Sequence, residues 1–96
     1  MITATSKVMT SRTLRVMNRA GLHTRPAAML VKLAATFASD VHLVKDGFHI
    51  NAKSIIGVMT LAAEYGTELL LEVDGLDQDE AAEAIARLFA TGFGEQ

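Results

Sequence analysis

The chain has 96 residues, half of them hydrophobic, and a formal net charge of −2. That length suits one small domain with its own core, and the slight negative charge argues against a broad nucleic-acid or membrane surface. The chain has no cysteine, which excludes disulfides and thiolate metal sites. It has no apolar run of about 18 residues and no signal-peptide core, so we expect a soluble, cytoplasmic protein that binds neither nucleic acid nor membrane.

The N-terminal part combines an unpatterned stretch with a strand pattern. Residues 1–9 show no periodicity, and we expect a flexible extension before a single domain of residues 10–96. In residues 10–18, Leu14 and Val16 point to one side and the residues between them to the other. Such alternation is typical of a half-buried strand.

A helix is predicted over residues 24–38. Pro26 is compatible with it, because a proline in the first turn removes no helical hydrogen bond. Apolar residues recur at helical spacing and form a core stripe of Ala27, Leu30, Val31, Ala34 and Phe37. The solvent-facing side is marked by Lys32, Thr36 and Ser39.

Residues 41–51 predict a hairpin closed by Asp46 and Gly47, a strong two-residue turn signal. In this register Lys45 pairs with Phe48. The side chains expected on the core face are Val41, Leu43, Phe48 and Ile50, and those on the other face are His42, Val44, His49 and Asn51.

A second helix is predicted from an N-cap at Ser54 to Glu64 or Tyr65, with Gly66 at the position after its end. Gly57 inside it costs about 1 kcal/mol relative to alanine, which suggests close packing or a docking surface. Residues 67–74 alternate again, with Leu69, Leu71 and Val73 directed inward.

The last helix has the clearest signals. Asp77 is expected to cap it, Glu80 to complete a capping box, and Gly92 to end it. Its buried stripe is formed by Ile85, Leu88 and Phe89. The order β-α-β-β-α-β-α predicts an α+β fold, an open-faced β-sandwich with a four-stranded antiparallel sheet and three helices on one face.

The chemistry is concentrated where the first strand gives way to the first helix. Gly21 permits a tight turn, and the helix start offers unpaired N–H groups and the positive end of its dipole. Such a junction suits a phosphate. His23 places a nucleophilic imidazole there, and Arg25 adds a cation suited to phosphate oxygens.

Two segments carry a family resemblance. The run Gly21-Leu22-His23-Thr24-Arg25-Pro26-Ala27 resembles the phosphohistidine signature of the HPr family, the small phosphocarriers of the bacterial phosphoenolpyruvate-dependent sugar phosphotransferase system. Downstream, the run from Asn51 to Leu61 resembles the family's regulatory serine region. The resemblance implies the same open-faced sandwich.

The resemblance also implies a function. His23 would accept a phosphoryl group on Nδ1 from phospho-enzyme I, with Arg25 beside it, and pass it to EIIA-type acceptors. Ser54 would be a regulatory phosphorylation site for an HPr kinase/phosphorylase. The protein would be a monomeric carrier with a covalent phosphohistidine rather than a turnover enzyme, and it would need no cofactor and no metal.

Partner docking is expected on a patch shared by the first two helices. In the family, residues at the positions of Ile55, Ile56 and Met59 contact enzyme I and the sugar-specific acceptors, and residues of the first helix would complete the patch. The patch comprises Thr24, Ala28, Lys32, Ile55, Ile56 and Met59, rimmed by Arg25, Lys32 and Lys53. Of the apolar members, Ile56 is expected to be the most exposed.

Three alternatives stay open. Residues 88–93 look closer to the regulatory, nitrogen-linked branch of the family, whereas the segment at Ser54 favours the sugar branch. A non-catalytic interaction domain on the same scaffold is the rival from another class, since a fold does not fix a function. His42 and His49 make at most a weak metal site, because no carboxylate or thiol partner is evident in the sequence.

Overall fold

The computed structural model describes residues 8–95. The flexible extension predicted for residues 1–9 therefore lies outside the described residues, except for Val8 and Met9. The elements in chain order are β1 (Thr10–Arg15), α1 (Thr24–Ala35), β2 (Asp40–Lys45), β3 (Phe48–Asn51), α2 (Ile55–Thr60), β4 (Glu68–Asp74), α3 (Gln78–Ala90) and a 3₁₀ turn (Gly92–Gly94).

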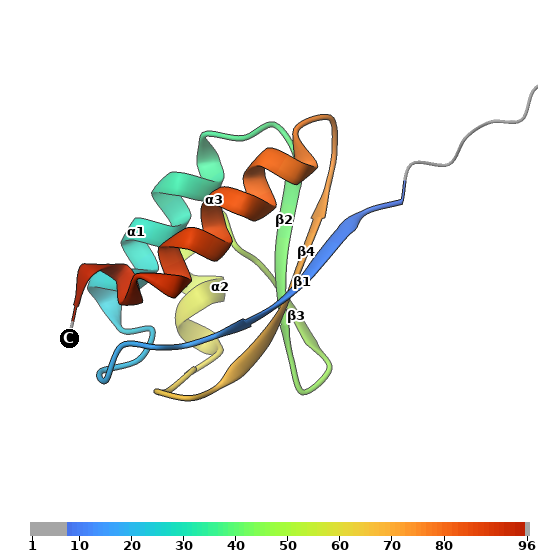
Figure 1. Ribbon diagram of the computed structural model, residues 1–96. Coiled ribbons are helices and arrows are strands. Elements are labelled where there is room, and N and C mark those ends of the chain that lie inside the picture. The colour runs from blue at the N-terminus through green and yellow to red at the C-terminus, as the bar shows by residue number, and fades with distance from the viewer. Residues whose placement is uncertain (1–7, 96) are drawn as a thin grey trace, which may run out of the picture.

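The four strands form one antiparallel sheet in the order β1-β4-β2-β3, so β4 and β2 are central. Helices α1, α2 and α3 all cover one face of this sheet and leave the other open (Figure 1). The predicted open-faced sandwich is confirmed. No helix among residues 8–95 is both long enough and apolar enough to cross a membrane.

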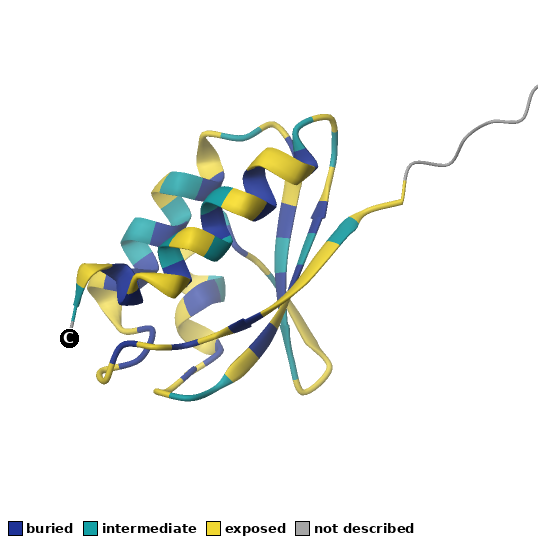
Figure 2. Cartoon of the chain, viewed as in Figure 1, coloured by how far each residue is buried: buried dark blue, intermediate teal, exposed yellow. Residues whose placement is uncertain are grey.

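The core lies between the sheet and the helices (Figure 2). On β4, Leu69, Leu71 and Val73 are buried while the residues between them are not, as the alternation predicted. The largest fully buried side chains are Phe89, Phe93, Leu30, Leu43, Leu69, Leu71, Ile85, Val16, Val41, Val58, Val73 and Asn18.

The β2–β3 hairpin has the predicted register, with Lys45 opposite Phe48 across the Asp46–Gly47 turn. Both turn residues have positive φ, which such a turn requires. The expected burial of Phe48 is wrong, because its side chain is 72% exposed. The alternation puts Phe48 on the core side of the hairpin. However, Phe48 is the first residue of β3 and lies next to the hairpin turn, away from the core.

Helix α1 ends at Ala35, three residues before the predicted Ala38. The carboxylate of Asp77 accepts the backbone N–H groups of Ala38 and Ser39 and the hydroxyl of Ser39. These bonds turn the chain out of the helix, and they bury Ser39, which had been expected to face solvent.

The same contacts overturn the predicted capping box. Asp77 stands at the N-cap position of α3, but its side chain makes no cap hydrogen bond to that helix. Its oxygens instead accept hydrogen bonds from backbone N–H groups in the segment between α1 and β2. Asp77 is therefore a tertiary staple between the end of α1 and the start of α3.

Helix α2 is shorter than predicted, since it ends at Thr60 rather than near Tyr65. Ala62 adopts a positive φ of 49°, which stops the helix, and Gly66 donates its N–H to the carbonyl of Val16 rather than following a helix end. Ser54 is the N-cap, as predicted, and accepts the N–H of Gly57 at 3.1 Å.

The Asp77 staple predicts acid-dependent stability. The Ser39 hydrogen bond, followed by that of Ala38, lowers the pKa of Asp77 below its ordinary 3.8. The stabilisation is therefore complete above 3.8 and is lost as pH falls through the lowered pKa. Asp77→Asn should lower the urea midpoint of unfolding at neutral pH. The difference in midpoint between this variant and wild type should become smaller in acid.

Glu80, an exposed carboxylate in the first turn of α3, provides the control: Glu80→Gln should leave the urea midpoint nearly unchanged at both pH values. If the difference in urea midpoint between wild type and Asp77→Asn stayed constant from neutral pH to well below 3.8, the stabilising role of the ionised Asp77 would be refuted.

Candidate functional site

His23 is the N-cap residue of α1, with an extended backbone at φ −81° and ψ −170°. Its carbonyl accepts the first helical bond, from the N–H of Ala27 at 2.9 Å. The N–H groups of Thr24 and Arg25 precede that bond and have no partner within the helix, and Pro26 has no N–H to offer. The imidazole, 44% exposed, thus stands at the positive end of the helix.

The loop before His23 is fixed against the segment that follows α2. Gly21 has a φ of +74°, and a Cβ there would lie 2.6 Å from the carbonyl oxygen of Ala63. The same oxygen accepts the N–H of Leu22 at 2.9 Å. Only glycine fits this close approach at positive φ, which explains the glycine in the signature.

Glu95 joins the histidine and the arginine. Nε2 of His23 lies 3.1 Å from Oε1 of Glu95, and Nη1 of Arg25 donates to Oε2 at 3.0 Å. Oε1 also accepts from Nδ2 of Asn18 at 3.1 Å. A single carboxylate, 16% exposed, therefore holds His23 and Arg25 side by side.

The C-terminal turn brings Glu95 to this position. Gly92, Phe93 and Gly94 have φ values of 62°, 57° and 73°, so the chain leaves α3 in a left-handed turn and folds back toward His23. Phe93 is fully buried and packs edge-on against Phe89, with ring centroids 4.9 Å apart. That burial anchors the turn.

Asn18 makes hydrogen bonds to both sides of the site. Its side chain is fully buried, and Nδ2 donates to the carbonyl of Gly21 at 2.7 Å as well as to Glu95. Both partners can only accept, which fixes the orientation of the amide. Its Oδ1 is buried without a hydrogen-bond partner among residues 8–95. Asn18 thus links the signature loop to the C-terminal turn.

The hydrogen bond from His23 is the largest cause that lowers the pKa of Glu95 below its ordinary 4.5. Burial, the second-largest effect, opposes it, and the hydrogen bonds from Asn18 and Arg25 lower the pKa further. Glu95 is therefore ionised at neutral pH and can only accept. Nε2 must carry the hydrogen, so in the neutral ring Nδ1 holds the free lone pair.

The sequence predicted roles for His23 and Arg25 but gave no signal for Glu95 and none for Asn18. Glu95 lies 72 positions from His23 along the chain, and only the Gly-Phe-Gly turn before it hints at a reversal.

The residues expected to bind partners lie on α1 and α2, which pack against each other. Ile56 is 73% exposed, Ile55 40% and Met59 39%. Of the α1 members, Thr24 and Lys32 are exposed and Ala28 is half-buried.

One expected rim cation is engaged elsewhere. Nζ of Lys53 donates to the carbonyl of Phe37 at 2.8 Å, beyond the end of α1. Lys53 therefore also makes a structural contact with the segment after α1. Ser54 is half-buried at the start of α2, beside the patch.

His42 and His49 lie on the open face of the sheet. Contrary to expectation, a carboxylate is near, because Oε1 of Glu72 lies 3.6 Å from Nδ1 of His49. Within residues 8–95, no group of three or more histidine, aspartate or glutamate side chains is arranged to hold a metal ion.

Comparison with known proteins identifies the family. Residues 10–91 match the family described as the PTS HPr component phosphorylation site. The chain is 51% identical over 88 residues to the phosphocarrier protein HPr of Treponema pallidum, which covers 92% of this chain and 100% of that protein.

Two solved structures from Thermoanaerobacter tengcongensis are also similar. HPr-C-His superposes with a TM-score of 0.89 at 40% identity, covering 92% of this chain and 99% of that one. An HPr dimer superposes with a TM-score of 0.74 at 37% identity, covering 99% of this chain and 100% of that one. The chain therefore belongs to the HPr family of phosphocarrier proteins of the phosphotransferase system.

Proposed function

We propose that Nδ1 of His23 accepts a phosphoryl group from phospho-enzyme I and passes it to EIIA-type acceptors. The observation that carries this proposal is the contact between Nε2 of His23 and the ionised Glu95. It leaves Nδ1 as the nucleophilic nitrogen, at an exposed position beside the start of α1. No hydrogen bond to Nδ1 is found within the described chain.

The transfer is a displacement at phosphorus. The Nδ1 lone pair forms a new N–P bond while the P–N bond of the donor's phosphohistidine breaks, and that electron pair returns to the donor imidazole. Positive charge develops on the ring of His23, whose Nε2 hydrogen stays bound to Glu95. The carboxylate stabilises this charge, and positioning supplies the rest of the catalysis.

Arg25 would hold the incoming phosphoryl oxygens. Its contact with Glu95 uses Nη1, so the guanidinium keeps further N–H donors, and the side chain is 64% exposed. The N–H groups of Thr24 and Arg25 offer two more donors at the same end of the helix. The phosphoryl oxygens would thus be bound both by a guanidinium cation and by backbone N–H groups at the start of α1.

The patch formed by Thr24, Ala28, Lys32, Ile55, Ile56 and Met59 would bind enzyme I and the acceptors in turn. An exposed apolar surface next to Arg25 and Lys32 suits transient partners with acidic rims. His23 and this patch come from a single copy of the chain, and we therefore propose a functional monomer.

Ser54 would be the regulatory site, phosphorylated by an HPr kinase/phosphorylase. A phosphate there stands at a helix N-terminus, where it does not oppose the helix. It would add about two negative charges beside the docking patch and repel acidic partners.

Replacement of His23 tests the proposal directly. His23→Ala should abolish labelling by enzyme I and radioactive phosphoenolpyruvate, because the nucleophile is gone, whereas His49→Ala should be labelled like wild type. The label on wild type should be acid-labile, as expected of a phosphohistidine. Full labelling of His23→Ala, or none of wild type as for a non-catalytic interaction domain, would refute the proposal.

Ser54→Asp tests the electrostatic effect on docking. Aspartate is also a good N-cap, so the fold should persist. Transfer from enzyme I should slow about tenfold at low salt, and the difference should shrink as salt is added. Ser11→Asp, on the open face of the sheet, is the matched control. Equal rates for both variants would contradict electrostatic interference.

The titration of Glu95 tests the network around His23. Since the folded pKa is lowered, the network is fully formed above 4.5 and is lost as pH falls through that lowered value. Carbon-13 NMR should place the carboxyl midpoint below 4.5 in wild type and closer to 4.5 in His23→Ala. His49→Ala should not move the midpoint. If His23→Ala did not move it either, the role of Glu95 would be refuted.

A further inference from the structure

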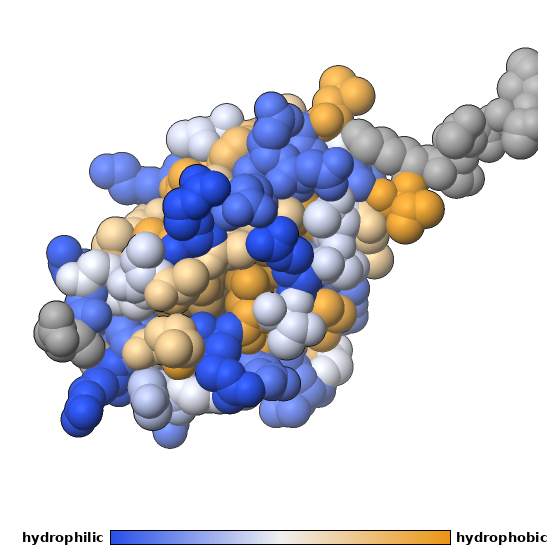
Figure 3. Space-filling view, viewed as in Figure 1, coloured by the Kyte–Doolittle hydropathy of each residue, from blue (hydrophilic) through white to orange (hydrophobic). Residues whose placement is uncertain are grey.

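A recess lies between β1 and α3, and its lining includes none of His23, Arg25 and Glu95. Its volume is about 520 Å³. Figure 3 shows apolar surface at the bottom of this hollow, surrounded by hydrophilic side chains. We call it the β1–α3 cleft, and the residues that line it are Arg12, Thr13, Leu14, Arg15, Met17, Glu83, Ala86, Arg87, Phe89 and Ala90.

The floor of the β1–α3 cleft is apolar and preformed. Leu14 and Phe89 are buried beneath it, and α3 contributes Ala86 and Ala90, one helical turn apart. Alanine side chains are too short to fill the space between the strand and the helix, so the cleft stays open. Met17, 50% exposed, adds apolar surface to its lining.

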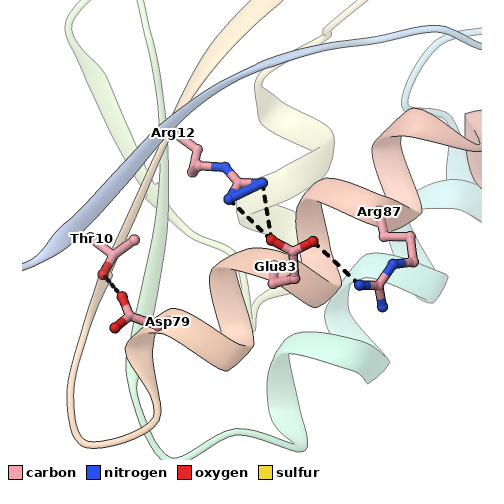
Figure 4. Close-up of polar contacts among 5 residues, drawn as sticks. All are labelled: Thr10, Arg12, Asp79, Glu83 and Arg87. Carbon is pink, nitrogen blue, oxygen red and sulfur yellow. Dashed lines mark hydrogen bonds and ion pairs between the residues drawn. The ribbon is translucent and has the colours of Figure 1, made fainter.

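The rim of the cleft is positively charged and ordered. Arg12 donates from both terminal nitrogens to Oε1 of Glu83, at 3.2 and 3.3 Å, and Arg87 donates to Oε2 at 3.3 Å (Figure 4). Two guanidinium groups therefore share one carboxylate, which leaves a net positive charge at the rim of a chain whose net charge is −2. Both arginines keep unused N–H donors.

The backbone beside the cleft is also available for pairing. The sheet order puts β1 at an edge, and none of the described strands pairs with its outer side. An extended segment added to that edge would form backbone hydrogen bonds with β1. Every second side chain of the added segment would then point toward the helices, over the cleft floor.

We propose that the edge of β1 and the β1–α3 cleft form a docking site for an extended, acidic peptide segment of a partner protein. An aliphatic side chain of that segment fills the space over Leu14 and Phe89. Carboxylates two positions before and after it, on the same face, pair with Arg12 and Arg87. This site lies apart from His23 and does not depend on its phosphorylation.

The charges and the shape favour this occupant over two others. A second copy of the chain pairing through β1 would bring the arginines of the two strands together, which is repulsive. A small ligand would remain largely exposed, since the rim side chains of Arg12 and Arg87 are themselves 42% and 67% exposed, whereas small-molecule sites enclose most of their ligand.

The test uses the isotopically labelled full chain and the capped peptide acetyl-Thr-Glu-Thr-Leu-Thr-Glu-Thr-amide. NMR shifts should change at the β1 amides and at the methyl groups of Leu14, Ala86 and Ala90, and should saturate by about 1 mM. The same peptide with lysine in place of glutamate should cause no change. His23→Ala should bind as wild type does, so this test is independent of phosphocarrier activity.

Variants locate the site. Arg12→Gln with Arg87→Gln should weaken binding about three- to tenfold, and Ala86→Leu, which fills the cleft, should abolish the methyl shifts. Arg19→Gln, an exposed arginine in the loop before His23, is the matched control. Spectra unchanged outside the cleft show that each variant is folded.

The proposal is overturned if no β1 amide shifts, if the lysine peptide binds equally, or if the double variant binds as tightly as Arg19→Gln. It is also overturned if N-acetylglutamate amide alone reproduces the shifts, which would indicate a small-anion site. β1 shifts that depend on protein concentration without peptide would indicate self-association and would overturn it as well.

Discussion

The carboxylate of Glu95 organises the site around His23. It accepts from Nε2 of His23, from Arg25 and from the buried amide of Asn18. Because it is ionised and can only accept, it assigns the ring hydrogen to Nε2 and leaves Nδ1 with its lone pair. One group therefore sets the position of the arginine and the protonation pattern of the histidine.

The rest of the domain holds His23 and Glu95 in place. On one side, Gly21 and Leu22 are fixed against the carbonyl of Ala63, in the segment that follows α2 and the turn at Ala62. On the other, buried Phe93 anchors the left-handed turn that brings Glu95 back from α3. Asn18 connects the two sides, and segments from the beginning, middle and end of the chain thus converge on one imidazole.

The features that are local in sequence were predictable. The Asp46–Gly47 turn fixed the hairpin register, and the alternation around Leu71 identified the buried face of β4. Pro26 and the glycine-histidine spacing located the start of α1 and the candidate nucleophile.

The features that depend on distant partners were not predictable. Asp77 has the local pattern of a helix cap, yet its oxygens bind the backbone of Ala38 and Ser39. Glu95 has no local signal, because its role depends on where the folded chain places His23. The role of each of these two residues is determined by hydrogen bonds to residues distant in the sequence, which the neighbouring sequence does not indicate.

The central claim is that Glu95 fixes the tautomer of His23. Nitrogen-15 NMR of the imidazole in the unphosphorylated chain at neutral pH tests it most directly. The account predicts that the neutral form of the ring carries its hydrogen on Nε2 and leaves Nδ1 unprotonated. A ring with the hydrogen on Nδ1, or an even mixture of the two tautomers, would contradict it.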